Sequence, residues 1–171
     1  MTNKSSFILL AKFGAIRGLK MKVKDLPWYD YNTTGDVIDK IPKECRGNTN
    51  SGFIYLLTFS NGMQYIGKKN FYRRHTAARL VSGNERAGHI SWSKDRKKEH
   101  FYTESDWRNY LGSGKNYKKS DIVERCIIRT CQTRKQLCYY EAYELFTRKV
   151  LLDKTYYNDN ILGKFYRRDL I

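Results

Sequence analysis

The chain has 171 residues, and its 33 Lys and Arg against 17 Asp and Glu give a formal net charge of +16 at pH 7. This length suits one domain with its own core and is too short for two sizeable domains. The charge favours a polyanionic partner, nucleic acid above all, and no apolar run approaches the ~20 residues of a membrane span, so we expect no membrane partner.

We expect residues 1–51 to form an N-terminal extension of short helices and turns that packs on a main domain at 52–171. Near its start, the apolar segment 7–13 is interrupted by Lys12, and no small-residue cleavage site follows, so we predict no signal peptide. The four cysteines form no Cys-x-x-Cys pair and the three histidines are scattered, which argues against a zinc site. Reduced thiols without a leader indicate a cytoplasmic protein.

Residues 52–69 predict a β-hairpin with one tyrosine in each strand. Side chains alternate along a strand, so a two-residue turn would put Tyr55 and Tyr65 on opposite faces of the sheet. A three-residue loop ending at Gly62 would pair Tyr65 with Leu57 instead and bring both tyrosines to one face. A shared site for the two hydroxyls requires the second arrangement. That the tyrosines serve only in packing is an equally open alternative.

The next two segments predict a helix and an insertion. Apolar spacing over residues 70–81 suits a short helix, and residues 84–121 are polar and basic, which suits a loop followed by a short helix that stops at Gly112. We expect one run in this insertion to contact backbone phosphates without reading sequence, although such a run is usually just solvated: Arg96, Lys97 and Lys98.

Residues 122–130 predict a third strand, and a Thr133/Gln136 capping box predicts a helix of some 18 residues to about Leu152. On a helical wheel Glu141 falls inside the apolar stripe, whereas Glu144 falls at its margin. An ionised carboxylate on a buried face costs several kcal/mol unless a cation or a metal answers it. Glu141 is therefore the carboxylate to explain, with pairing to Arg148 or a turn toward solvent as the alternatives.

As an ordered set, these features resemble the GIY-YIG nuclease superfamily. Its paired motifs stand here as Phe53-Ile54-Tyr55, with Phe in place of the usual Gly, and Tyr65-Ile66-Gly67. Tyr156-Tyr157-Asn158 looks like the family's Asn motif, and Tyr110–Lys115 resembles the phage-encoded branch that includes freestanding homing endonucleases. The resemblance implies an α+β fold, with a small three-stranded antiparallel sheet flanked by helices.

It also implies an activity, namely metal-dependent hydrolysis of phosphodiester bonds in double-stranded DNA, of the homing or restriction type, with Mg²⁺ or Mn²⁺ as cofactor. Tyr55 matches the tyrosine that activates water, with the metal and Lys68 or Lys69 supplying the positive charge that a phenol needs. Tyr65 would position the water or the phosphate. Glu141 matches the single acidic metal ligand.

The remaining roles concern nucleic-acid contacts and support of the site. The family places a phosphate-clamping arginine on the helix after the second motif, for which Arg74 is the first choice and Arg73 and Arg79 are the alternatives. Gly67 and Asn158 would support the site, although an ordinary turn Asn is an alternative for Asn158. Further nucleic-acid contacts are expected from Lys68, Lys69, Arg73 and Lys115.

Only a short stretch follows Asn158, so we expect no separate DNA-binding domain and expect the contacts to come from residues 1–51, from the insertion or from a second subunit in a homodimer on DNA. Two other functions stay open. One is a non-catalytic nucleic-acid-binding protein of the same fold, against which the joint presence of the four candidate catalytic residues argues. The other is an RNA-binding or RNA-cleaving protein, since 14 Tyr and 8 Phe could stack on unpaired bases.

Overall fold

The predicted hairpin is the centre of a four-stranded sheet in the computed structural model, which describes residues 22–33, 35–76 and 100–170. Strand β2 (Gly52–Phe59) pairs antiparallel with β3 (Gln64–Asn70) on one side and with β6 (Ile122–Cys131) on the other. The two-residue strand β1 (Tyr29–Asp30) adds a parallel edge next to β6, which gives the order β1-β6-β2-β3. The α+β class and the antiparallel core of the sheet are thus as predicted, and β1 is an addition.

The turn between β2 and β3 has the three-residue form. Leu57 pairs with Tyr65, and the Phe59 N–H donates to the Met63 carbonyl at 2.9 Å across the loop. Gly62 has a φ of +80°, in the left-handed region that glycine enters without a Cβ clash. Tyr55 and Tyr65 therefore lie on the same face of the sheet, as a shared site requires.

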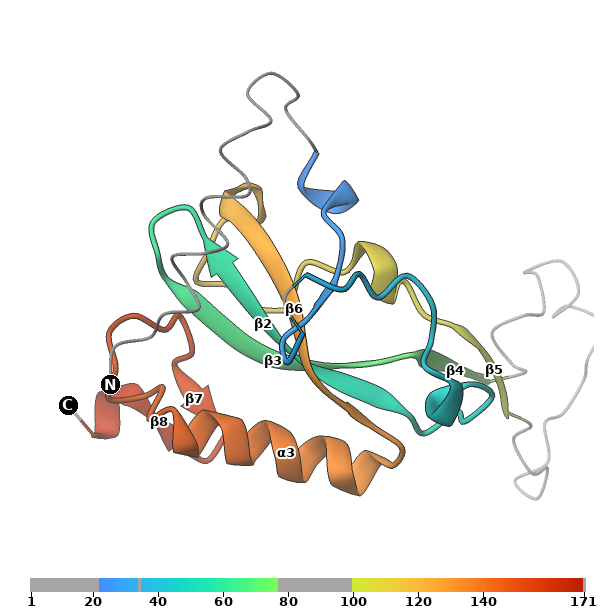
Figure 1. The fold of residues 1–171 in the computed structure, drawn as a ribbon. Coiled ribbons are helices and arrows are strands. Elements are labelled where there is room, and N and C mark those ends of the chain that lie inside the picture. The colour runs from blue at the N-terminus through green and yellow to red at the C-terminus, as the bar shows by residue number, and fades with distance from the viewer. Residues whose placement is uncertain (1–21, 34, 77–99, 171) are drawn as a thin grey trace, which may run out of the picture.

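Helix α3 (Arg134–Thr147) lies along the opposite face of the sheet (Figure 1). The predicted capping box is present, because the Thr133 hydroxyl accepts from the Gln136 main-chain N–H at 3.1 Å and the Gln136 side-chain Oε1 accepts from the Thr133 N–H at 3.3 Å. The helix stops well before Leu152, where we predicted its end. Lys149 has a φ of +51° and the Val150 N–H donates to the Leu145 carbonyl at 3.1 Å, the hydrogen bond of a Schellman terminus.

Two apolar clusters hold the sheet, one on each face. The α3 face buries residues that include Ile54, Leu56, Ile66, Leu137, Leu145 and Val150. The other face carries the tyrosines and buries residues that include Leu26, Trp28, Phe53, Tyr55, Phe71 and Trp107. Within the described residues, this second face is covered by loops and by single 3₁₀ turns, not by the flanking α-helix that we expected: Val23–Asp25, Lys43–Cys45, Trp107–Asn109 and Lys119–Asp121.

The helix predicted over residues 70–81 is wrong where the structure describes it. Residues Tyr72–Thr76 form strand β4, which pairs antiparallel with β5 (His100–Glu104). The partner strand is distant in sequence, so local spacing cannot reveal the pairing. Phe71, which supported the helix, is instead buried between Phe53 and Trp107. The predicted site residues Arg79, Arg96, Lys97 and Lys98 lie outside the described residues.

After α3 the chain returns along the outer side of β3. The Gln64 N–H donates to the Thr155 carbonyl and the Tyr157 N–H donates to the Gln64 carbonyl, both at 2.8 Å. A small hairpin of β7 (Asn160–Ile161) and β8 (Phe165–Tyr166) and a 3₁₀ turn at Arg167–Asp169 follow near the end of α3 (Figure 1). Within the described residues, none of the helices has the length and hydrophobicity that a membrane-spanning segment requires.

Candidate active site and nucleic-acid interface

Tyr55 lies in the middle of β2, directly opposite Gly67 of β3. Its side chain is fully buried, and among the described residues no group meets hydrogen-bond geometry at its hydroxyl oxygen, although the Tyr110 hydroxyl comes close enough to act on its pKa. A Cβ at residue 67 would overlap that oxygen, so a glycine is needed for the ring to lie across β3. Burial, with the neighbouring phenols of Tyr65, Tyr110 and Tyr117, raises the pKa of Tyr55 well above its usual value. In this arrangement the phenol is neutral and shielded from water.

Tyr65 is half-buried beside it, with ring centroids 6.2 Å apart. Burial raises the pKa of the Tyr65 phenol, a hydrogen bond with Ser113 opposes that shift, and the Glu141 carboxylate adds to it. Tyr65 is therefore the more accessible hydroxyl of the pair, and it also lies within the electrostatic reach of Glu141.

A segment that we term the covering loop, residues 108–117, lies over both tyrosines. Tyr110 packs edge-on against Tyr55 with ring centroids 5.7 Å apart, and Tyr117 packs against Tyr65 at 5.1 Å. Arg125 on β6 anchors the loop, because its Nη1 donates to the carbonyls of Arg108 at 2.9 Å and Tyr110 at 3.2 Å. We did not predict this anchor, since Arg125 reads in the sequence only as one residue of an alternating strand.

On the other face of the sheet, Glu141 forms an ion pair with Lys68. The Lys68 Nζ lies 2.8 Å from Glu141 Oε2, and the Glu141 side chain is only 17% exposed. Burial acts to lower the pKa of Lys68, but the hydrogen bond and charge of Glu141 raise it overall. Lys68 Nζ also donates to the Cys138 Sγ at 3.3 Å. A cation thus pairs with the half-buried Glu141 carboxylate, and this cation is Lys68, not Arg148.

Arg148 pairs with the neighbouring carboxylate instead. Its Nε lies 3.0 Å from Glu144 Oε2, and Glu144 is buried rather than marginal. The wheel misplaced Glu144 because it counted Cys138, which is exposed in the structure, and so shifted the stripe away from Glu144. The buried residues of α3 are Leu137, Glu144 and Leu145, and on the wheel Glu141 falls between Leu137 and Leu145.

The sheet separates the predicted catalytic groups. Tyr55 and Tyr65 lie on one face and the Lys68–Glu141 pair lies on the other, because successive side chains of β3 alternate. β3 is an outer strand of the four-stranded sheet, and residues 155–158 bond to its outer side at Gln64 and Ile66, so the two faces meet along the later part of the strand. The structure therefore brings the tyrosines together and Lys68 to Glu141, but it does not place all of them on one surface.

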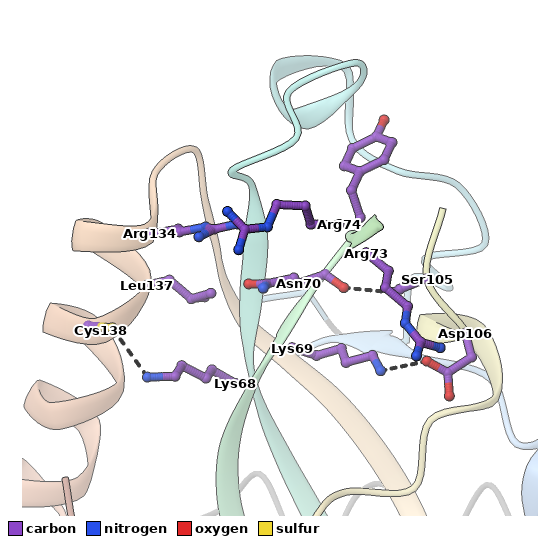
Figure 2. Close-up of a pocket in the computed structure, with 11 residues that line it drawn as sticks. Lys68, Lys69, Asn70, Arg73, Arg74, Ser105, Asp106, Arg134, Leu137 and Cys138 are labelled. Atoms are coloured by element: carbon purple, nitrogen blue, oxygen red, sulfur yellow. Dashed lines mark hydrogen bonds and ion pairs between the residues drawn. The ribbon is translucent and has the colours of Figure 1, made fainter. Parts of the chain in front are cut away.

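Beside this edge lies an open cavity of about 760 Å³, which we term the basic pocket (Figure 2). It is lined by the end of β3, the start of β4, the start of α3 and the segment at Ser105–Asp106. Its charged lining residues are Lys68, Lys69, Arg73, Arg74, Arg134 and Asp106. Lys69 Nζ lies 2.5 Å from Asp106 Oδ1 and 3.9 Å from the centroid of the Tyr110 ring. Among the described residues, the three arginines of the pocket form no ion pair.

The other predicted residues lie around this site. Asn158 is buried and pairs with both main-chain groups of Ile66, accepting from its N–H at 3.0 Å and donating to its carbonyl at 2.8 Å. It therefore holds β3 at the centre of the second motif. Lys115 is exposed on the covering loop and does not line the basic pocket. His75, the neighbour of Arg74 on β4, stacks on Phe101 and does not line the pocket.

The donor set suits a metal that brings most of its own ligands. Within the described residues, no group of three His, Cys, Asp or Glu side chains could hold an ion. Glu141 alone fits a Mg²⁺ or Mn²⁺ ion that keeps several waters and takes substrate phosphate oxygens. Because Lys68 already contacts Glu141, such an ion must share the carboxylate with Lys68 or displace it.

A comparison with protein families matches residues 37–161 to the family described as "Putative endonuclease segE, GIY-YIG domain". The match covers well over half of the chain. The chain belongs to this GIY-YIG family. Searches of curated proteins and of solved structures returned no match. The matched region contains the paired motifs, the described basic pocket, α3 and Asn158, so this is a domain of the GIY-YIG nuclease type, with nucleic acid as its substrate class.

Two features of this GIY-YIG domain depart from the expected pattern. Phe53, in the position of the first-motif Gly, is a buried core residue that packs edge-to-face against Trp28 and Trp107. Arg74 lies on strand β4 instead of a helix, yet it still lines the basic pocket. The catalytic roles of Tyr55, Tyr65, Arg74 and Glu141 stay predictions, as does the domain boundary at residue 52.

Proposed function

We propose that this domain is a metal-dependent endonuclease that hydrolyses phosphodiester bonds in double-stranded DNA, in a homing- or restriction-like role. The observation that carries the proposal is the position of the basic pocket. Its cations lie next to Glu141, the α3 carboxylate that pairs with Lys68. Lys68 itself lines the pocket and can transfer its contact from the carboxylate to a phosphate. A phosphodiester backbone in the pocket would thus pass beside Glu141.

The cations of the pocket would bind the backbone and Arg74 would clamp the phosphate that is cleaved. Arginine suits this role, because its planar fork of donors matches two phosphate oxygens. An arriving phosphate would draw Lys68 from Glu141 to a phosphate oxygen, and the Glu141 carboxylate would then be available to hold the metal. A metal bound there supplies positive charge to the phosphate as charge develops on it.

The tyrosines would act on the water and the phosphate from the edge of β3. Tyr65 is half-accessible and can donate or accept a hydrogen bond where it stands. Tyr55 can take a proton from water only if the covering loop opens and a cation approaches, because a buried neutral phenol is no base. Asn158 would keep β3 in register while this happens.

The test is to incubate the protein with plasmid DNA and Mg²⁺, Mn²⁺ or EDTA and then to sequence the ends. We expect cleavage with either metal and none with EDTA. Binding without cleavage would support the non-catalytic alternative, and cleavage confined to RNA would support the RNA alternative. Cuts on both strands at a fixed offset would support a homodimer on DNA.

A further inference from the structure

Arg134 is the first residue of α3, and we had assigned it no role from the sequence. Its side chain lines the basic pocket together with Arg74, which comes from β4 (Figure 2). Both arginines are exposed. Two elements that are distant in sequence therefore bring two guanidinium groups into one cavity.

This arrangement costs free energy in the absence of an anion. Like charges that share a cavity repel one another, and among the described residues neither guanidinium has an ion-pair partner. The first turn of α3 holds no acidic residue, so nothing on the helix itself offsets the charge of Arg134. An anionic ligand in the pocket would remove this repulsion.

The position of Arg134 on α3 relates it to Glu141. Residues seven apart lie on nearly the same face of a helix, separated by about 10 Å along its axis. Cys138, which also lines the pocket, lies between them on that face. The phosphates of one DNA strand rise by about 3.4 Å each, so 10 Å spans at most about three of them.

We propose that Arg134 is a phosphate-binding residue that holds the substrate strand at a backbone phosphate no more than about three nucleotides from the one at Glu141. The proposal rests on the proposed nuclease function and adds a second contact point on the cleaved strand. Arg134 acts on binding and does not take part in the chemical step.

The experiment measures duplex binding in EDTA, by fluorescence anisotropy at several salt concentrations, for the wild type, Arg134→Gln and Lys135→Gln. Lys135 is the matched control, because it is exposed in the same helical turn but does not line the pocket. Both variants lose one positive charge. We expect Arg134→Gln to weaken binding about three- to tenfold and to reduce the slope of log affinity against log salt by about 0.9, as for one lost phosphate contact.

A second measurement shows where the DNA binds. Cys138 is the one exposed cysteine, because Cys45, Cys126 and Cys131 are buried, so alkylation with iodoacetamide reports on the basic pocket. We expect bound duplex to slow alkylation of Cys138 in the wild type. At the same duplex concentration, we expect Cys138 of Arg134→Gln to be protected less than Cys138 of the wild type.

Three results separate the outcomes. Equal affinities and salt slopes for Arg134→Gln and Lys135→Gln would overturn the proposal, as would a Cys138 that duplex does not protect. A folded wild type that binds no duplex at any salt concentration would instead contradict the proposed function itself.

Discussion

The Lys68 Nζ lies 2.8 Å from the Glu141 Oε2, so the carboxylate that we expect to hold a metal is held by a lysine. This contact joins β3 to α3 across the α3 face of the sheet. Under the proposed function, a metal ion would compete with Lys68 for this half-buried carboxylate. Lys68 pairs with Glu141 in the structure, and a phosphate that attracted Lys68 would leave Glu141 open to a metal.

Replacing Lys68 with Met should consequently tighten metal binding in the absence of DNA. We expect Mn²⁺ affinity, measured from the electron paramagnetic resonance signal of the free ion, to rise about tenfold or more, because the competing charge-assisted contact contributes on the order of 1.5–3 kcal/mol. Lys69→Met is the matched control, since Lys69 pairs with Asp106 and not with Glu141. Equal Mn²⁺ affinity in the wild type and both variants would show that Lys68 does not compete for the metal site.

Tyr55→Phe should stabilise the fold at neutral pH. The hydroxyl is buried without a hydrogen-bond partner, and such a group costs about 1–3 kcal/mol, which the variant removes with little change in volume. Chemical denaturation would measure the gain, and Tyr139→Phe on the exposed side of α3 is the control, expected to stay within about 0.5 kcal/mol. A loss of stability in Tyr55→Phe would mean that the hydroxyl has a partner after all.

The same variant should be less sensitive to alkali. Burial raises the pKa of Tyr55 in the folded state, so the folded protein holds the phenol proton more tightly than the unfolded chain does. The free energy of unfolding is therefore unaffected by this group below the unfolded pKa near 10 and falls as the pH rises above it. Tyr55→Phe lacks this loss. We expect its stability advantage over the wild type to widen above about pH 10, as followed by denaturation at a series of pH values. An advantage that stays constant with pH would contradict the buried, neutral phenol.

Despite its greater stability, Tyr55→Phe should cleave DNA slowly. If Tyr55 activates water when the covering loop opens, turnover should fall by about 10²–10⁴-fold, as is typical of a lost general base. Single-turnover cleavage of a labelled duplex measures this. A loss of tenfold or less would assign water activation to the metal or to Tyr65.

Asn158→Ala should act through the fold. It leaves the N–H and the carbonyl of Ile66 without partners, and we expect a loss of about 2–4 kcal/mol in the free energy of unfolding. Asn116→Ala is the control, because Asn116 is exposed and forms one hydrogen bond, to Asp159. Unchanged stability with lost cleavage would point to a direct role in catalysis.

The local parts of this site could be predicted from sequence, and the parts that depend on distant pairing could not. The Gly62 loop and the Thr133 cap are decided by neighbouring residues, and both are present as expected. The strand at Tyr72–Thr76 depends on a partner at His100–Glu104, which no local spacing encodes. The helical wheel identified Glu141, but it could not show that the cation paired with Glu141 is Lys68 of β3.

Arg134 and Arg125 show a second limit of sequence reasoning. Arg134 reads as an ordinary cation at a helix start, and its place in the basic pocket follows only from how α3 packs against the main sheet, which brings it to the same cavity as the β4 arginines. Arg125 reads only as one residue of an alternating strand, yet it is 1% exposed and packs over the Trp28 ring. Both positions depend on tertiary packing, which one strand or one helix taken alone does not reveal.

The most direct test of the nuclease assignment compares the wild type with Glu141→Ala in two assays on the same plasmid. The first measures cleavage with Mg²⁺, and the second measures binding in EDTA. We predict that the wild type cuts the plasmid and that Glu141→Ala does not, while their affinities for DNA agree within about threefold, because the substitution removes a metal ligand and no cation of the basic pocket. Cleavage by Glu141→Ala at the wild-type rate would contradict the account.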